Sequence, residues 1–362
     1  MKEIGIEIAL SSETLLAAAP PASNLIETLR FMPGNALRGV MARRYLDGGG
    51  SPEGEQFRRL FIDGEVRFGF AFRDGAEVIP LSARSCKYNP GFPADGGHGV
   101  KDLLLSVDEG VCRWPKCGRS MDYFRGYWHP AKEREASIET RLLTRTAIDP
   151  ARGTASGGQL FSQRTLAEGQ TFAATIEAPD DLSDAIASLV REPFEAVLGT
   201  GGSRGQGWAE IRSTSCPAMK RGSAKQRYAR FAERAGEPVL AVTLLSDGIF
   251  RDEYLRDATS PTLLDLAPLG IKPEDWISRP AQAFMDVRRV FGFDGVPIRL
   301  PRPPRLAVAA GSSFLFKAQA GRQPAAPKGS GEGWIGEANG EGYGRAVLWH
   351  PFHLGVAEGP AA

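Results

Sequence analysis

The sequence predicts an α+β chain built from two related ferredoxin-like domains. Two glycine-rich loops, at 198–207 and 340–345, each come directly before an apolar, strand-like run. In the first half the expected order is strand, helix, strands, helix, glycine loop and strand, which fits a βαββαβ unit. The second half repeats this pattern in a shorter form, so the two loops indicate an internal duplication.

The composition is globular and electrostatically balanced. The 362 residues are 42% hydrophobic and carry a formal net charge of +1, so a nucleic-acid surface must be a local patch. Four cysteines do not form a disulfide scaffold in a chain of this size. We find no signal peptide and no apolar run of 18 residues, and therefore expect a cytoplasmic location.

The first domain is predicted to span 1–216. It begins with a strand over 4–16, and Asn35 is a suitable N-cap for the helix that follows. A second helix is expected over 180–198. Between them, the irregular stretch of about 80–135 has weak periodicity and holds three of the four cysteines, which is typical of an insertion or functional loop.

A basic linker is predicted at 217–236, followed by the second domain at 237–362. Within the linker, Ser223 can cap a short helix that Gly236 would end. The second domain starts with a strand over 239–245 and ends with the second glycine loop and its strand. This half reads as a degenerate copy of the first.

Glycine-rich loops can expose backbone N–H groups that bind anions. On this interpretation the loops contact phosphates, and the alternative is two tight strand entries without a ligand. A GxGxxG string at 331–336 follows a Pro/Ala loop rather than a strand, so no nucleotide cofactor is expected. The residues predicted to contribute are Gly201, Gly202, Arg204, Gly205, Gly207, Gly342, Gly344 and Arg345.

The insertion contains residues that could hold a metal ion. Cys112 and Cys117 form a C-x4-C pair, and together with Cys86 and His98 they offer the sulfur and nitrogen donors of a tetrahedral zinc site. His129 is a competing ligand. A structural zinc would stabilise a segment with little core of its own; the alternative is a set of buried or free thiols.

Several short motifs, in this order, resemble the CRISPR-associated RAMP superfamily. The two loops resemble its G-loops, and 31–39 resembles the opening of its first helix. The stretch 85–102, the cysteine pair after it and Leu300–Pro303 resemble the type III-D Cas-five-like backbone subunit. This resemblance implies paired ferredoxin-like (RRM-like) domains. It also implies assembly with CRISPR RNA (crRNA), other Cas backbone subunits and the large Cas subunit, near target RNA, with the chain capping the crRNA 5′ handle.

Two basic regions are predicted to contact RNA. The first is the first helix, whose N-terminus can receive a phosphate and which carries Asn35, Arg38 and Arg43. The alternative is a surface helix with solvated arginines. A hairpin carrying basic side chains resembles the thumb of RAMP backbone subunits, or is a solvated hairpin. Its residues are Arg141, Arg145 and Arg152.

Catalysis is not expected. None of the four histidines, which include His350 and His353, lies in the first helix or beside the first glycine loop, where a general base would be needed. One alternative is a RAMP endoribonuclease that processes crRNA or cleaves target RNA, for which Asp149 is the residue to test. Another is a zinc-stabilised protein adaptor without RNA contact.

Overall fold

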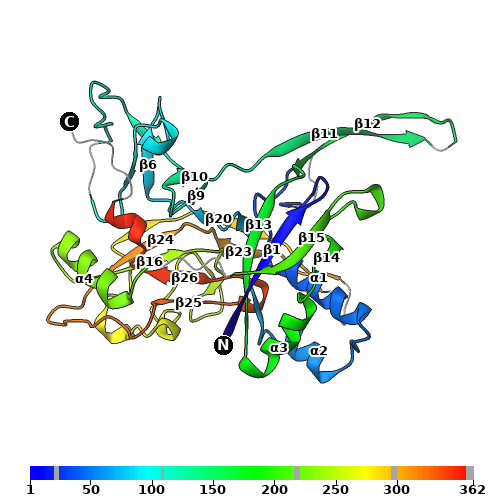
Figure 1. Ribbon diagram of the computed structural model, residues 1–362. Coiled ribbons are helices and arrows are strands. Elements are labelled where there is room, and N and C mark those ends of the chain that lie inside the picture. Colours follow the sequence, from blue (N-terminus) through cyan, green and yellow to red (C-terminus); the bar gives the residue numbers. More distant parts are fainter. Residues whose placement is uncertain (20–23, 107–109, 150, 216–220, 295–299, 356–362) are drawn as a thin grey trace. The chain divides into compact units, whose positions relative to one another are not determined.

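The computed structural model describes residues 1–19, 24–106, 110–149, 151–215, 221–294 and 300–355 (Figure 1). It is a mixed α/β chain in which strands predominate and four α-helices occur among the described residues. By its internal contacts the chain divides into two compact units. The first comprises 1–75, 138–217 and 289–305, and the second comprises 76–137, 218–288 and 306–362.

The first unit is built on an antiparallel sheet in the order β14-β15-β1-β13-β3, with β4 also pairing β13. Ile8 at the centre of β1 pairs with Phe172 on one side and Ile211 on the other. The strands are β1 (Lys2–Leu10), β2 (Leu25–Ile26), β3 (Arg67–Phe68), β4 (Phe72–Arg73), β11 (Thr140–Asp149), β12 (Thr154–Leu166), β13 (Thr171–Ala178), β14 (Phe194–Val197) and β15 (Trp208–Thr214).

Three helices of the first unit, α1 (Gly34–Asp47), α2 (Glu55–Phe61) and α3 (Asp180–Leu189), contribute apolar side chains to one core with the sheet. Asn35 does not cap α1: the N-cap is Pro33, whose φ of −69° suits the start of a helix, and Asn35 lies inside the helix. The helix predicted over 180–198 ends at Leu189. Pro193 disfavours helical backbone before it, and β14 follows.

The second unit has a similar antiparallel sheet, in the order β19-β24-β16-β26-β25. At its centre Val242 pairs with Phe314 and Leu348, as Ile8 pairs with its two neighbours in the first unit. The sheet strands are β16 (Val239–Leu244), β19 (Gln282–Phe284), β24 (Ser313–Lys317), β25 (Glu332–Trp334) and β26 (Arg345–Leu348), and the short strands β17 (Phe250–Arg251) and β18 (Asp257–Ala258) pair with each other.

The single α-helix described in the second unit, α4 (Ala224–Ala235), precedes its sheet and lies in the segment predicted as a linker. Ser223 forms the capping box and Gly236 ends the helix at φ 73°, as the sequence indicated. Arg227 is only 2% exposed and donates to the carbonyl oxygens of Gly222 and Leu348. The described part of 217–236 is therefore a packed helix and not a free connector; residues 217–220 lie outside the described residues.

The segment 76–137 belongs by its contacts to the second unit, although the sequence placed the stretch of about 80–135 inside the first domain. Whether the two units fold independently, as the predicted limits imply, stays a prediction. The strands of this segment are β5 (Glu77–Val78), β6 (Ala83–Cys86), β7 (Val100–Asp102), β8 (Met121–Tyr123), β9 (Tyr127–His129) and β10 (Arg134–Glu135).

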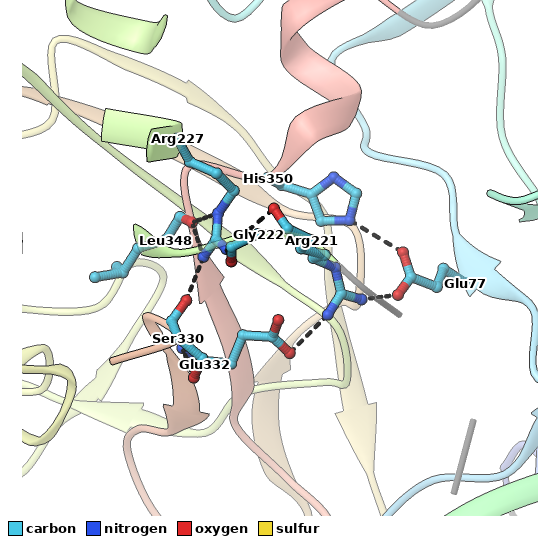
Figure 2. Close-up of polar contacts among 8 residues, drawn as sticks. All are labelled: Glu77, Arg221, Gly222, Arg227, Ser330, Glu332, Leu348 and His350. Carbon is cyan, nitrogen blue, oxygen red and sulfur yellow. Dashed lines mark hydrogen bonds and ion pairs between the residues drawn. The ribbon is translucent and has the colours of Figure 1, made fainter. Parts of the chain in front are cut away.

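A buried polar cluster anchors the start of this segment (Figure 2). The Arg221 guanidinium forms ion pairs with Glu77 and Glu332, and the Glu77 carboxylate also bonds His350 at 3.1 Å. Arg221 is 6% exposed, and burial lowers its pKa. Since an unpaired buried charge is strongly destabilising, these contacts fix the first strand of the segment against the end of the chain.

Two histidines of the C-terminal turn complete this anchor. His350 accepts from the N–H of Phe352 through Nδ1, so Nε2 carries the proton and donates to Glu77. Burial and the neighbouring Arg221 place the pKa of His350 well below its usual value. His353 bonds Asp102 at 2.9 Å and Thr243 at 2.8 Å, which ties β7 to the central strand β16.

Two further strand pairs are short. β20 (Val287–Val290) pairs with β23 (Arg305–Val308), and β21 (Phe293–Asp294) pairs with β22 (Leu300–Pro301). No helix in the described ranges is both long and apolar enough to cross a membrane.

Candidate nucleic-acid interface and metal site

The two glycine loops have the same backbone geometry. Each consists of one 3-10 turn, Gly202–Arg204 or Asn339–Glu341, followed by two glycines with positive φ that flank one other residue. The glycine φ values are 79° and 84° at Gly205 and Gly207, and 91° and 83° at Gly342 and Gly344. The repeated geometry agrees with the duplication inferred from the sequence.

The same hydrogen bonds hold both loops to the central strand of their unit. The first N–H of the strand after the loop donates to a serine hydroxyl, and the last glycine of the loop donates to the carbonyl of the acidic residue after that serine. In the first unit Trp208 donates to Ser12 and Gly207 donates to Glu13, both at 2.9 Å. In the second unit Arg345 donates to Ser246 at 2.9 Å and Gly344 donates to Asp247 at 2.6 Å. Sequence reasoning missed these serines, although each lies two residues after its strand.

These bonds limit what the loops can offer an anion. The N–H groups of Gly205, Gly207, Gly342 and Gly344 all donate to carbonyls within the protein. The second loop is buried from Gly340 to Gly344, whereas Arg204 in the first is exposed. The geometry therefore favours close backbone packing for these glycines, and their contact with RNA stays a prediction.

An acidic residue links each loop to the strand pair beside it. The Glu13 carboxylate lies 3.3 Å from Arg141, and that of Asp247 lies 2.7 Å from Nε of Arg288. Glu13 is 24% exposed, but Asp247 is only 2% exposed, and burial raises its pKa despite the adjacent guanidinium. Arg141, which the sequence assigned to RNA, is thus already paired in this structure.

The predicted thumb is a long hairpin formed by β11 and β12, which extends far beyond the sheet of its own unit (Figure 1). Arg145 is half-buried along β11, and Arg152 is exposed in the connecting turn. Asp149 is the last residue of β11, and its backbone pairs with Thr154. The hairpin has the reach of a projecting arm, while RNA contact by its arginines stays a prediction.

A groove of about 610 Å³ separates α1 from β14 in the first unit. Helix α1 contributes Asn35, Gly39 and Arg43, and Trp208 at the start of β15 is 41% exposed. Arg44 lies 4.8 Å above the ring of Phe194. Arg38 is half-buried, and Arg43 bonds Asp47 at 3.0 Å. The groove thus combines arginines with aromatic faces, of which the sequence reasoning identified only the arginines.

The four predicted metal ligands Cys86, His98, Cys112 and Cys117 come together in the second unit, with their donor atoms within 4.8 Å of one another. The sulfurs of Cys86 and Cys117 are 3.7 Å apart, and Cys112 Sγ lies 3.6 Å from Nδ1 of His98. Tetrahedral zinc with ordinary bond lengths places two sulfurs about 3.8 Å apart, and a sulfur and a nitrogen about 3.6 Å apart. The donors fit zinc; His129 does not belong to this group.

The surroundings of the thiols also fit metal binding. Burial alone would raise the pKa of Cys86, but N–H groups of Asn89 and Tyr88 donate to its sulfur and the pKa is lowered. Burial raises the pKa of Cys112 to about 11, so this thiol loses its proton less readily than Cys86 and favours metal binding less. The Asn89 amide lies 2.9 Å from His98 Nε2, where a side-chain oxygen would orient a ligand histidine. The group can therefore hold a metal ion.

No protein-family model matches this chain, and neither does any curated protein sequence. Among solved structures, a chain of the type III-B Cmr-beta complex bound to cognate target RNA is 11% identical, with 86% of each chain covered and a TM-score of 0.46. A chain of the same complex bound to cognate target RNA and AMPPnP is 10% identical, with 86% of each chain covered and a TM-score of 0.42. Cmr4 (Cas7) from Pyrococcus furiosus gives 12%, with 59% of this chain and 99% of that chain covered and a TM-score of 0.28.

Proposed function

We propose that this chain is a non-catalytic subunit that binds crRNA and scaffolds a type III, III-D-like, CRISPR effector complex, where it caps the 5′ handle of the crRNA. The observation that carries the proposal is the glycine loop, which has the same geometry and hydrogen bonds in both units and is the motif that resembles the RAMP G-loop. The sheet orders around β1 and β16 support two ferredoxin-like domains. Other Cas backbone subunits, the large Cas subunit and nearby target RNA are the partners that follow.

The α1–β14 groove is the RNA surface in this proposal. Arg43 and Arg44 would contact phosphates, and the exposed face of Trp208 would stack on an unpaired base. The β11–β12 hairpin would act as the thumb. RNA bound mainly through phosphates loses affinity steeply as the salt concentration rises.

The test is binding of labelled repeat RNA to the full chain over a range of salt concentrations. We expect the double variant Arg43→Glu, Arg44→Glu to weaken binding and to reduce the slope of log affinity against log salt by about one for each phosphate that is no longer neutralised. Arg58→Glu is the matched control, because Arg58 is an exposed helical arginine in an ion pair outside the groove. Equal binding by all three proteins would refute this RNA surface.

The positions of three of the four histidines support a non-catalytic role. His350 and His353 are buried and bonded within the protein, and His98 belongs to the metal-binding group. A general base must reach the proton that it removes from the substrate. The competing function, an RNA-cleaving enzyme that depends on Asp149, is tested by substitution of that residue.

We further propose that Cys86, His98, Cys112 and Cys117 hold one structural Zn²⁺, which stabilises the segment 76–137. Elemental analysis of the purified chain should give one zinc per molecule. Cys117→Ser should lose the metal and lower the thermal midpoint, whereas Cys216→Ser, at the remaining cysteine, should retain it. A metal-free wild-type chain with the same thermal midpoint would refute this site.

A further inference from the structure

A shallow hollow of about 410 Å³ lies beside the metal-binding group. Two of its walls are the ligand side chains His98 and Cys117 themselves. The remaining wall carries Tyr88, Asn89, Trp114, Pro115, Lys116 and Arg119. Among these lining residues there are two aromatic rings and two permanent cations, and no carboxylate.

The aromatic rings are presented in fixed positions. The side chain of Tyr88 is 63% exposed, and the guanidinium of Arg119 lies 5.3 Å from its ring centroid. Trp114 stacks on the ligand His98, with ring centroids 4.9 Å apart and an angle of 5° between the planes. Lys116 is exposed next to this stack. An exposed tyrosine under an arginine, beside a stacked tryptophan, offers flat apolar faces with positive charge around them.

The metal-binding group itself positions these rings. Tyr88 follows Cys86 by two residues, and its backbone N–H donates to the Cys86 sulfur. Trp114 follows Cys112 by two residues, and its N–H donates to the Cys112 sulfur. The surface is therefore pre-organised by the same loops that hold the ligands, which reduces the entropy cost of binding a ligand.

We propose that this hollow is a subsite for an unpaired RNA nucleotide, whose base stacks on Tyr88 and whose phosphate is met by Lys116 and Arg119. The inference rests on the proposed RNA-binding function but assigns a contact to a surface separate from the α1–β14 groove. Stacking on aromatic faces tolerates any base, and arginine and lysine neutralise the backbone, so the subsite reads an unpaired strand rather than a sequence. A peptide anchor is less well matched, because Pro115 is the one aliphatic side chain among the lining residues.

The test compares full-length variants for binding to labelled oligouridine RNA at one fixed salt concentration. Tyr88→Ala should weaken binding about tenfold, and Tyr88→Phe, which keeps the ring, should bind like the wild type. Tyr254→Ala is the matched control, since Tyr254 is 68% exposed and also lies under an arginine, Arg256, at 4.9 Å. RNA containing 5-iodouridine should crosslink to Tyr88 or Trp114.

The outcomes separate the subsite from the general function. If Tyr88→Ala binds like the wild type while the Arg43, Arg44 double variant is impaired, the subsite is refuted and the RNA-binding proposal stands. If the wild type binds no RNA, both are refuted. If Tyr88 crosslinks to another subunit of an assembled complex and its loss leaves RNA affinity unchanged, the hollow is a protein contact and the subsite is likewise refuted.

Discussion

The first glycine loop gives a quantitative prediction, because two of its glycines share positive φ but differ in the space around them. Gly205 and Gly207 both have positive φ, at 79° and 84°. A Cβ at Gly205 would meet no atom within 4 Å, whereas a Cβ at Gly207 would lie 2.2 Å from the carbonyl oxygen of Leu198. The alanine variants therefore separate the cost of left-handed backbone from the cost of the close approach.

Left-handed backbone costs a non-glycine residue about 1–2 kcal/mol, which is the loss of unfolding free energy expected for Gly205→Ala. Gly207→Ala adds the steric conflict. If the loop moves to relieve it, the hydrogen bonds from Gly207 to Glu13 and from Leu198 to Gly207 are weakened, at about 0.5–1.5 kcal/mol each. The expected total for Gly207→Ala is about 2–5 kcal/mol.

The duplication extends the prediction to the second unit. A Cβ at Gly344 would lie 1.9 Å from the carbonyl oxygen of Ile335, so Gly344→Ala should resemble Gly207→Ala. Guanidinium unfolding measures the total change. Native-state hydrogen exchange locates it, which is necessary because a chain of two units need not unfold in one step. We expect faster exchange in β1 and β15 for Gly207→Ala, and in β16 and β26 for Gly344→Ala. Equal losses for Gly205→Ala and Gly207→Ala would refute the close-packing explanation.

Three further predictions concern His350, the acidic pair Asp247 and Glu13, and Asp149. Because the pKa of His350 is lowered on folding, the unfolded chain binds a proton that the folded chain does not. The free energy of unfolding of the wild type should therefore fall below about pH 6.5, by up to about 1.4 kcal/mol per pH unit. Chemical unfolding of His350→Asn should show a weaker dependence on pH. Asp247→Ala should cost about 3 kcal/mol, since it removes the buried acceptor of the Ala310 N–H and of Arg288, and Glu13→Ala less than about 1 kcal/mol; equal losses would contradict the difference in burial. Asp149→Ala should leave gel assays of target RNA unchanged, and any wild-type cleavage that it abolishes would establish the enzyme alternative.

The features that could be predicted from the sequence are those encoded by neighbouring residues. Positive φ at Gly205 and Gly207 follows from glycine itself, and the helix from Ser223 to Gly236 follows from local capping chemistry. The C-x4-C pair drew attention to the metal-binding group, and the structure brings all four predicted ligands together.

The features that the sequence did not predict depend on distant partners. Nothing near Glu77 in the sequence indicates that its carboxylate meets Arg221 and His350, so the assignment of the insertion to the second unit could not be inferred. The same holds for Arg227, whose basic character suggested a linker although backbone carbonyls satisfy it in the interior. A local sequence pattern does not distinguish a buried charged residue of this kind from a solvated one.

The two glycine loops share the same backbone hydrogen bonds but differ in their polar surroundings. In the first unit the loop is exposed at Arg204, its acid is partly solvated, and an open groove with arginines adjoins it. In the second unit the loop is buried and the Asp247 carboxylate is desolvated, although its partner Arg288 is 36% exposed. Since exposed cations remain available to ligands, the RNA contacts proposed for the two glycine loops belong to the first loop.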